Sequence, residues 1–407
     1  MSNLLDKASI ILTPTAYNTS EVLCVKPSDA TGDMDFLRAT DATRINSLGL
    51  IETNAINLPR INYEGGCGSW LFEPQSTNLI TYSETLGNNT TSGGISFTYN
   101  NSISPDGTQN AALVSVTSAN DRLQPSFAAV NSLVAISIFL KHNGTDFTTQ
   151  INTFNTGDST LFGATAAVTA SNVIFTSYQG GFDSASFVDY GNGWFRVIVV
   201  CQSTTGTTFA QWRPTTVSVA LSYPCFGFQV EVQDFATSYI KTDSGSTVTR
   251  NQDLCNNGGS LSSINSTEGV LYAEIAALAD NATRRDITIS DGTTSNRVML
   301  RYDNSSNRIQ AFIQVGGSTN GNMNTTSFTI TNFLKIAYKW KAGDFALWVN
   351  GTEVATSTDA TSFAPDVLTE VNFDRGESNG EFYFGKTKCL AVFPILTDAE
   401  LTSLTTI

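Results

Sequence analysis

Histidine limits the chemistry that this chain can do, because the sequence contains only one, His142, in the turn-like segment LKHNGTD. Nucleophilic systems that pair serine or cysteine with histidine would all depend on this residue, and metal sites built from several histidines are excluded. We identify no partners that would complete a triad around His142, and a lone histidine in a loop is typical of a solvated side chain. The sequence therefore argues against these enzyme classes.

A phosphate-loop pattern is matched at 380–387, which reads GEFYFGKT. The pattern binds phosphate because a flexible glycine loop lies between a strand and the N-terminus of a helix. Here the central Phe-Tyr-Phe residues favour a strand, and the following KCLAVFPIL favours another strand. We therefore reject nucleotide binding and predict no cofactor.

Carboxylates are numerous, and Glu231 with Asp234 and Glu370 with Asp374 are pairs that lie next to predicted strands. A glycosidase needs two acids held about 5–10 Å apart across the sugar. Neither spacing sets two acids on one face at a cleft, and acidic residues near strand ends are mostly solvated. We predict that the protein is not an enzyme. A depolymerase that uses carboxylates is the less favoured alternative.

Sugar binding without catalysis would use an aromatic face framed by hydrogen-bonding side chains. Trp212 and Arg213 in FAQWRPTT, and Tyr178 in TSYQGGF, are the candidates closest to loop-like sequence. We predict that these three residues contact a glycan. For Trp212 the alternative is packing in the core or against another subunit, because tryptophan is highly buried on average.

The composition places these residues in an all-β protein. The chain has 407 residues, of which 41% are hydrophobic and 14% charged, and its 31 glycines fit many short strands joined by turns. A net charge of -14 argues against nucleic-acid binding. The longest apolar run, LVAISIFL, is far shorter than the roughly 20 residues of a membrane span, and we expect no secretion signal. The six scattered cysteines are expected to be reduced core residues.

The pattern of strands predicts three regions. Residues 1–65 have little periodicity and are expected to form an extended arm, ordered by lying across another subunit or the following domain. Residues 66–254 contain a series of strands, among them LVAISIFLKH, GNGWFRVIVVC and VSVALSYP, typical of an antiparallel sandwich or jelly roll. Residues 255–407 hold a second strand series, after the polar, glycine-rich stretch NQDLCNNGGSLSSINSTEG.

Two local signals within the last region are specific. Asn350-Gly351 between two alternating strands predicts a tight hairpin. In LTDAELTSLTTI, Thr397 followed three residues later by Glu400 predicts a helix that begins with a capping box.

The ordered segments RINYEGGCGSWLFEPQSTNLITYSE, SPDGTQNAALVS, GNGWFRV and GFQVEVQDFATSYIKTDSGSTVTRNQD resemble a pattern shared by bacteriophage fibre and tail-associated proteins. The resemblance covers residues 60–255. It implies a jelly-roll module similar to carbohydrate-binding modules, placed after an N-terminus that attaches to the virion.

The last 150 residues resemble the laminin-G/concanavalin A-like lectin sandwich, chiefly through LKIAYKWKAGDFALWVNGTEVATST and LAVFPILTDAELTSL. Members of that superfamily bind glycans or proteins, and some use calcium. No calcium site can be assigned here residue by residue, and no acid motif of its glucanase members matches.

These resemblances imply a structural virion protein, a tail or head fibre or appendage. It would attach to other virion proteins through residues 1–65 and present two lectin-like sandwiches to bacterial surface polysaccharide or protein. A homo-oligomer is expected, with a trimer favoured, because multivalency strengthens weak glycan binding. The alternative is a purely architectural subunit of the head or tail that binds no ligand.

Overall fold

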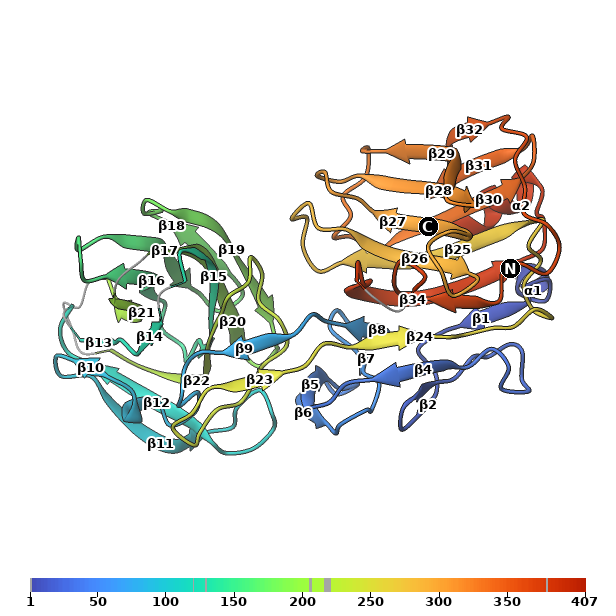
Figure 1. The fold of residues 1–407 in the computed structure, drawn as a ribbon. Coiled ribbons are helices and arrows are strands. Elements are labelled where there is room, and N and C mark those ends of the chain that lie inside the picture. The colour runs from blue at the N-terminus through green and yellow to red at the C-terminus, as the bar shows by residue number, and fades with distance from the viewer. Residues whose placement is uncertain (1, 120, 129, 205–206, 216–220, 378–379) are drawn as a thin grey trace. The chain divides into compact units, whose positions relative to one another are not determined.

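A computed structural model describes residues 2–119, 121–128, 130–204, 207–215, 221–377 and 380–407 (Figure 1). Antiparallel strands make up nearly all of its regular structure, which confirms the predicted all-β class. Within this described part, no helix has the length and apolar character needed to cross a membrane. The chain divides into two compact units: unit 1 comprises residues 1–41, 54–74 and 252–407, and unit 2 comprises residues 42–53 and 75–251.

Unit 1 is a sandwich of an eight-stranded and a five-stranded sheet, with a four-stranded sheet beside them. The eight-stranded sheet runs β32 (Thr352–Ser357), β31 (Phe345–Val349), β30 (Leu334–Lys341), β25 (Glu268–Ala277), β34 (Gly385–Phe393), β8 (Ser69–Phe72), β7 (Ile61–Asn62), with β1 (Ile10–Leu12) on β34. The five-stranded sheet runs β29 (Ser318–Thr325), β28 (Ile309–Val315), β27 (Arg297–Tyr302), β26 (Arg285–Ser290), β33 (Glu370–Asn372). The small sheet is β2 (Tyr17–Asn18), β3 (Glu21–Val22), β4 (Met34–Leu37), β24 (Leu254–Asn256).

The first 65 residues differ from the predicted extended arm, because most of them are built into unit 1. Strand β1 pairs with β34, and β4 pairs with β24, as Figure 1 shows by the blue strands beside red and yellow ones. Leu12 and Phe36 are buried in the same core as Leu271 of β25. These apolar side chains would face water in a free arm, so their burial draws the segment onto the sandwich.

A buried ion-pair network joins the same early segments to residue 253. Asp253 accepts hydrogen bonds from Arg38 Nη1 at 3.0 Å and, at its other oxygen, from Arg60, and Arg60 Nη1 also donates to Glu73 at 2.7 Å. All four side chains are at most 3% exposed. Buried charges of this kind are stable only when paired, so residues 38, 60, 73 and 253 depend on one another. The predicted domain boundaries at 65/66 and 254/255 therefore differ from the boundaries of the two units.

Unit 2 is a second sandwich, of a six-stranded and a seven-stranded sheet. The six-stranded sheet runs β11 (Ser96–Ser102), β12 (Ala111–Val116), β22 (Leu221–Glu231), β15 (Ser132–Lys141), β20 (Trp194–Ser203), β19 (Phe182–Asp189). The seven-stranded sheet runs β10 (Thr91–Ser92), β13 (Arg122–Leu123), β21 (Thr207–Pro214), β16 (Phe147–Asn155), β17 (Leu161–Val168), β18 (Val173–Thr176), with β14 (Ser126–Ala128) on β21. Two short pairs complete the unit, β5 (Ala42–Ile45) with β6 (Ile51–Asn54) and β9 (Ser76–Asn78) with β23 (Val248–Arg250). A short 3-10 helix covers Leu86–Asn88.

The core of unit 2 lies between its two sheets and contains alternate residues of both, such as Ile136 of β15, Ile151 of β16 and Trp212 of β21. The other side of the six-stranded sheet is covered in part by the β5–β6 pair, where Ile51 packs with Phe139 and Trp194. On the outward side of the seven-stranded sheet, alternate residues such as Gln150 and Asn152 of β16 are polar.

The two specific local predictions are confirmed. Asn350 and Gly351 adopt positive φ angles of 50° and 81° in the turn between β31 and β32. Helix α2 (Asp398–Thr405) begins at Thr397 with both hydrogen bonds of the capping box, and helix α1 (Ser2–Leu5) is a single turn. The first half of the predicted strand VSVALSYP, residues 217–220, lies outside the described residues, and its second half, residues 221–224, begins β22.

Candidate functional site

The seven-stranded sheet of unit 2 differs in charge from the rest of the protein. As described, its strands contain two charged residues, Arg122 and Arg213, and no acidic residue. The other large sheets all contain acidic residues, as expected for a chain with 36 Asp and Glu against 22 Lys and Arg. Among its four large sheets, as described, this acidic protein thus carries one whose only charges are positive.

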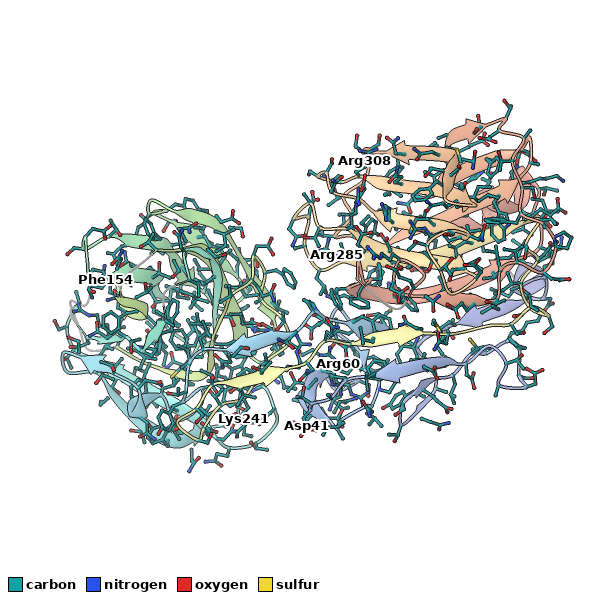
Figure 2. All side chains as sticks on the ribbon, viewed as in Figure 1. Asp41, Arg60, Phe154, Lys241, Arg285 and Arg308 are labelled. Carbon is teal, nitrogen blue, oxygen red and sulfur yellow. The ribbon has the colours of Figure 1, made fainter. Side chains whose placement is uncertain are left out.

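Alternate residues of these strands form three rows on the outward side of the sheet. In β16, Phe147 and Ile151 point into the core, so Gln150, Asn152 and Phe154 lie on the outer side. Strand pairing aligns these three with their neighbours, giving an arginine row (Thr165, Gln150, Arg213, Arg122), an amide row (Gly163, Asn152, Gln211, Gln124) and an aromatic row (Leu161, Phe154, Phe209, Ser126). We call this surface the outer face; Figure 2 labels Phe154 on it.

The arginine row places two positive charges on adjacent strands. Leu123 pairs with Trp212, so Arg122 lies opposite Arg213 in the antiparallel ladder. Burial and the charge of Arg122 lower the pKa of Arg213. Like charges directly opposite one another destabilise a sheet, and here no acidic side chain of the sheet relieves them.

The amide row contains a buried polar group with no partner. Asn152 is 0% exposed, and neither its Oδ1 nor its Nδ2 has a hydrogen-bond partner. It faces outward from the sheet, so the longer side chains of the two neighbouring rows must shield it from solvent. An unsatisfied buried amide is costly. Among the described residues, Asn110, Gln179 and Asn256 also have an amide oxygen without a partner, but Asn152 lacks a partner at both of its amide atoms, which makes it a candidate ligand contact.

The aromatic row supplies an apolar strip beside the amides. Phe154 and Phe209 lie directly opposite one another across β16 and β21, and both are half-buried. Rings in this position can stack on the apolar face of a sugar ring or of another flat group. The outer face therefore combines cationic, amide and aromatic side chains within three neighbouring rows.

Asp121 fixes the start of β13 and with it the position of Arg122. Its carboxylate accepts hydrogen bonds from the backbone N–H groups of Gly94 at 2.6 Å, Thr117 at 2.7 Å and Ser118 at 3.0 Å. Burial acts to raise the pKa of Asp121, but these hydrogen bonds outweigh it and the pKa is lowered. The acid next to Arg122 in sequence is therefore committed to the loop.

The structure separates the three residues that the sequence predicts as glycan contacts. Arg213 lies in the arginine row of the outer face. Trp212 is 1% exposed and its ring packs edge-on against Tyr223 in the core, so the prediction for Trp212 is corrected in favour of its alternative, core packing. Tyr178 is 58% exposed and packs on Phe182, between β18 and β19 and outside the three rows.

The histidine and the carboxylates that were considered for catalysis form hydrogen bonds within the fold. His142 Nε2 is 3.0 Å from Asp146 Oδ1 in an exposed turn. Glu231 is buried and accepts hydrogen bonds from Ser76 and Thr237. Asp374 is buried and accepts from the N–H of Gly376 at 2.6 Å, while Glu370 accepts from Asn372 at 3.0 Å.

The phosphate-loop pattern and the cysteines give no further site. Gly385, Lys386 and Thr387 begin strand β34, so the pattern lacks a following helix. All six cysteines are free thiols: three are buried and Cys67 is exposed, unlike the core position expected for it. In the part of the chain that is described, no group of three or more His, Cys, Asp or Glu is arranged to hold a metal ion.

Sequence reasoning missed Arg122, Asn152 and the two phenylalanines of the outer face. The one signal for them was compositional. FTTQINTFN, which becomes β16, has no charged residue and consists mainly of threonine, asparagine and glutamine.

Comparisons with known proteins add little to this description. No protein-family model and no curated protein matches the sequence. Three solved structures are similar: a Ruminococcus gnavus IT-sialidase CBM40 bound to alpha2,3 sialyllactose (16% identity, 37% of this chain and 93% of that chain, TM-score 0.32), a leech intramolecular trans-sialidase (18%, 37% and 26%, 0.31), and domains LG4-5 of the mouse laminin alpha1 chain (10%, 66% and 88%, 0.25). At these low TM-scores the similarities establish neither family nor ligand.

Proposed function

We propose that this chain is a non-catalytic structural protein of a bacteriophage particle and that the outer face of unit 2 binds glycans on the host surface. The observation that carries the glycan-binding part is the outer face itself: an unsatisfied buried amide between a row of arginines and a row of phenylalanines. Polar groups that fix a ligand beside aromatic surface are typical of small-molecule sites. The proposal for the particle is supported by the sequence pattern of residues 60–255.

Attachment to other virion proteins through residues 1–65 belongs to the same proposal, in an altered form. Residues 1–41 and 54–65 are part of unit 1 and residues 42–53 part of unit 2, so any attachment would use folded surface and not a free arm. A homo-oligomer, with a trimer favoured, would bring several outer faces to one polysaccharide and strengthen weak binding.

A glycan array probed with the full chain tests the function. We expect binding to one or more bacterial polysaccharides, and loss of that binding in Phe154→Ala, which removes half of the aromatic row. Tyr99→Ala is the matched control, because Tyr99 is 40% exposed on β11 of the other sheet of unit 2. Binding that survives in Phe154→Ala and is lost in Tyr99→Ala would place the site elsewhere.

Absence of binding to any glycan would overturn the adhesive role. The architectural alternative is then tested with virus particles made without the protein. If that alternative holds, these particles should be defective in assembly or stability. Mass spectrometry of purified particles checks the virion location. Release of reducing ends from a host polysaccharide by the purified chain would contradict the non-catalytic role.

A further inference from the structure

We infer that the glycan bound at the outer face is acidic, and that Arg122 and Arg213 together recognise a carboxylate on one of its sugar residues. The inference rests on the glycan-binding role proposed above and names the class of its ligand. It is carried by the way in which the two arginines are held.

Each arginine is held by a glutamine through its Nε atom. Arg213 Nε donates to Gln150 Oε1 at 2.7 Å, and Arg122 Nε donates to Gln124 Oε1 at 2.6 Å. Among the residues that the structure describes, the terminal nitrogens of both guanidinium groups have no hydrogen-bond partner and neither arginine forms an ion pair. The terminal N–H groups are the donors that bind a carboxylate in a two-point fork.

The choice of glutamine preserves the positive charge. Glutamate has the same shape and would accept the same hydrogen bond from Nε, but it would neutralise the arginine it holds. In a chain with 36 acidic residues, both supports are neutral amides. Neutral supports leave the repulsion between the two facing arginines in place, and an anion bound between them would reduce that repulsion.

Some arginines on other sheets are paired with acids, whereas Arg297 on β27 donates from Nε to Gln314 Oε1 at 3.0 Å and from Nη1 to the backbone oxygen of Arg375. On the five-stranded sheet of unit 1, Arg301 donates to both oxygens of Asp286, at 3.0 and 2.6 Å, and also to Glu381. Arg44 in the β5–β6 pair of unit 2 donates to Glu52 at 3.2 Å. As far as the described residues go, the outer face supplies no acidic partner for Arg122 and Arg213, so a carboxylate from outside completes the arrangement.

The amide row lies where the rest of the sugar would sit. Asn152 and Gln211 are in the row next to Arg213, and the aromatic row follows on the other side. A sugar whose carboxylate is at the arginine row would bring its hydroxyl groups over the amides and one ring face towards Phe154 and Phe209. Asn152 is 0% exposed, so the longer side chains of the neighbouring rows must move aside before a sugar hydroxyl can supply the hydrogen-bond partners that its amide lacks.

The test compares matched acidic and neutral polysaccharides with matched variants. Uronic-acid polysaccharides from the array are prepared in native and carboxyl-reduced forms, and binding to the full chain is measured by calorimetry. We expect the reduced forms to bind roughly tenfold to hundredfold more weakly, the loss typical of one charged hydrogen-bonded contact. Gln150→Glu and Arg213→Gln should weaken binding of the native forms to a similar extent.

Two controls separate recognition from folding. Gln310→Glu makes the same change on the outward side of β28 in unit 1 and should leave binding unchanged. Gln150→Glu and Arg213→Gln should keep or raise the unfolding midpoint, because both relieve repulsion between the arginines. If Gln150→Glu and Arg213→Gln instead lower the unfolding midpoint enough that unfolding explains the loss of binding, the inference is overturned.

The remaining outcomes distinguish this inference from the proposed function. If native and reduced polysaccharides bind equally and Gln150→Glu has no effect, the ligand is a neutral glycan: the acidic class is overturned and the glycan-binding role stands. If no polysaccharide of either form binds, both are overturned.

Discussion

Asn152 on β16 lies directly opposite Gly163 on β17, so the one buried and unpartnered amide of the outer face has no side chain beside it on that strand. A Cβ at Gly163 would lie 2.2 Å from the backbone oxygen of Ile151 and 2.6 Å from Cα of Asn152, so no other residue fits this position without moving the backbone. The two strands therefore approach each other closely at Asn152, and glycine is required at position 163.

Replacing Asn152 with leucine separates stability from binding. Asn152→Leu keeps the volume but removes two polar atoms that are buried without partners, so we expect the free energy of unfolding to rise by about 1–3 kcal/mol. Glycan binding should weaken at the same time. Chemical denaturation and the glycan array measure the two effects.

The comparison for this prediction is Gln310→Leu on the outward side of β28 in unit 1. Gln310 donates to Asn322 at 2.9 Å, so the same type of change removes a made hydrogen bond and should not stabilise the protein. If Asn152→Leu proves destabilising, the Asn152 amide contributes to the stability of the fold and is not kept for a ligand.

Part of the outer face could be predicted from sequence, and the limit is physical. Adjacent residues of a strand point to opposite sides of the sheet, so Trp212 and Arg213 had to face different surroundings. The sequence FAQWRPTT does not say which of the two lies outside. That choice is set by the packing of Trp212 against Tyr223, a residue on another strand.

The pairing of Arg122 with Arg213 could not be predicted, because it depends on the register of β13 against β21. Local signals were more reliable where the cause is local. The Asn350-Gly351 turn and the Thr397–Glu400 capping box both depend on residues within a few positions of each other. The division into units was missed because it depends on distant contacts such as Arg60 with Asp253.

Asp121 predicts how the stability of unit 2 depends on pH. Its pKa in the folded protein is lowered from the usual 3.8, so the folded state binds fewer protons than the unfolded state just below that pH. The stabilisation is fully present above about pH 4 and is lost as the pH falls through the lower folded pKa. Wild-type protein should therefore exceed Asp121→Asn in unfolding midpoint at pH 6, and the difference should shrink below pH 4.

The same variant should also weaken glycan binding at neutral pH, because the loop that precedes Arg122 loses its hydrogen-bond acceptor for three N–H groups. Asp158→Asn is a suitable control, since within the described part of the chain the Asp158 carboxylate accepts hydrogen bonds from nearby Thr160 in an exposed turn. A pH-independent difference between wild type and Asp121→Asn would show that the carboxylate's charge is not the cause.

Replacing Asp253 with asparagine should cause a large loss of stability that is confined to unit 1. Asp253→Asn leaves Arg38 and Arg60 buried with less negative charge, and Arg60 is labelled in Figure 2. Breaking a buried pair in this way costs about 3–5 kcal/mol. Hydrogen exchange should increase for the amides of β1, β4 and β34, while those of β15 and β20 keep their protection.

Asp344→Asn is the matched change at an ion pair of the same unit whose acid is exposed. Asp344 is 55% exposed and lies 2.8 Å from Lys339, a buried lysine that keeps Asp398 as a partner at 3.1 Å, so the change should cost less than about 1 kcal/mol. Equal effects of the two variants would mean that the buried network does not hold the early segments to unit 1.

A pair of leucines tests whether residues 1–65 are an arm or part of the folded units. Leu12 on β1 is 0% exposed in the core of unit 1, whereas Leu48, in the turn between β5 and β6, is 80% exposed. Leu12→Ala should therefore lower the free energy of unfolding by about 2–5 kcal/mol. Leu48→Ala should leave it nearly unchanged, because its side chain is already in water. Denaturant titration followed by tryptophan fluorescence measures both. In an extended arm the two substitutions would be equally harmless, so a neutral Leu12→Ala would return residues 1–65 to the role of a flexible tether and reopen attachment through an unfolded segment.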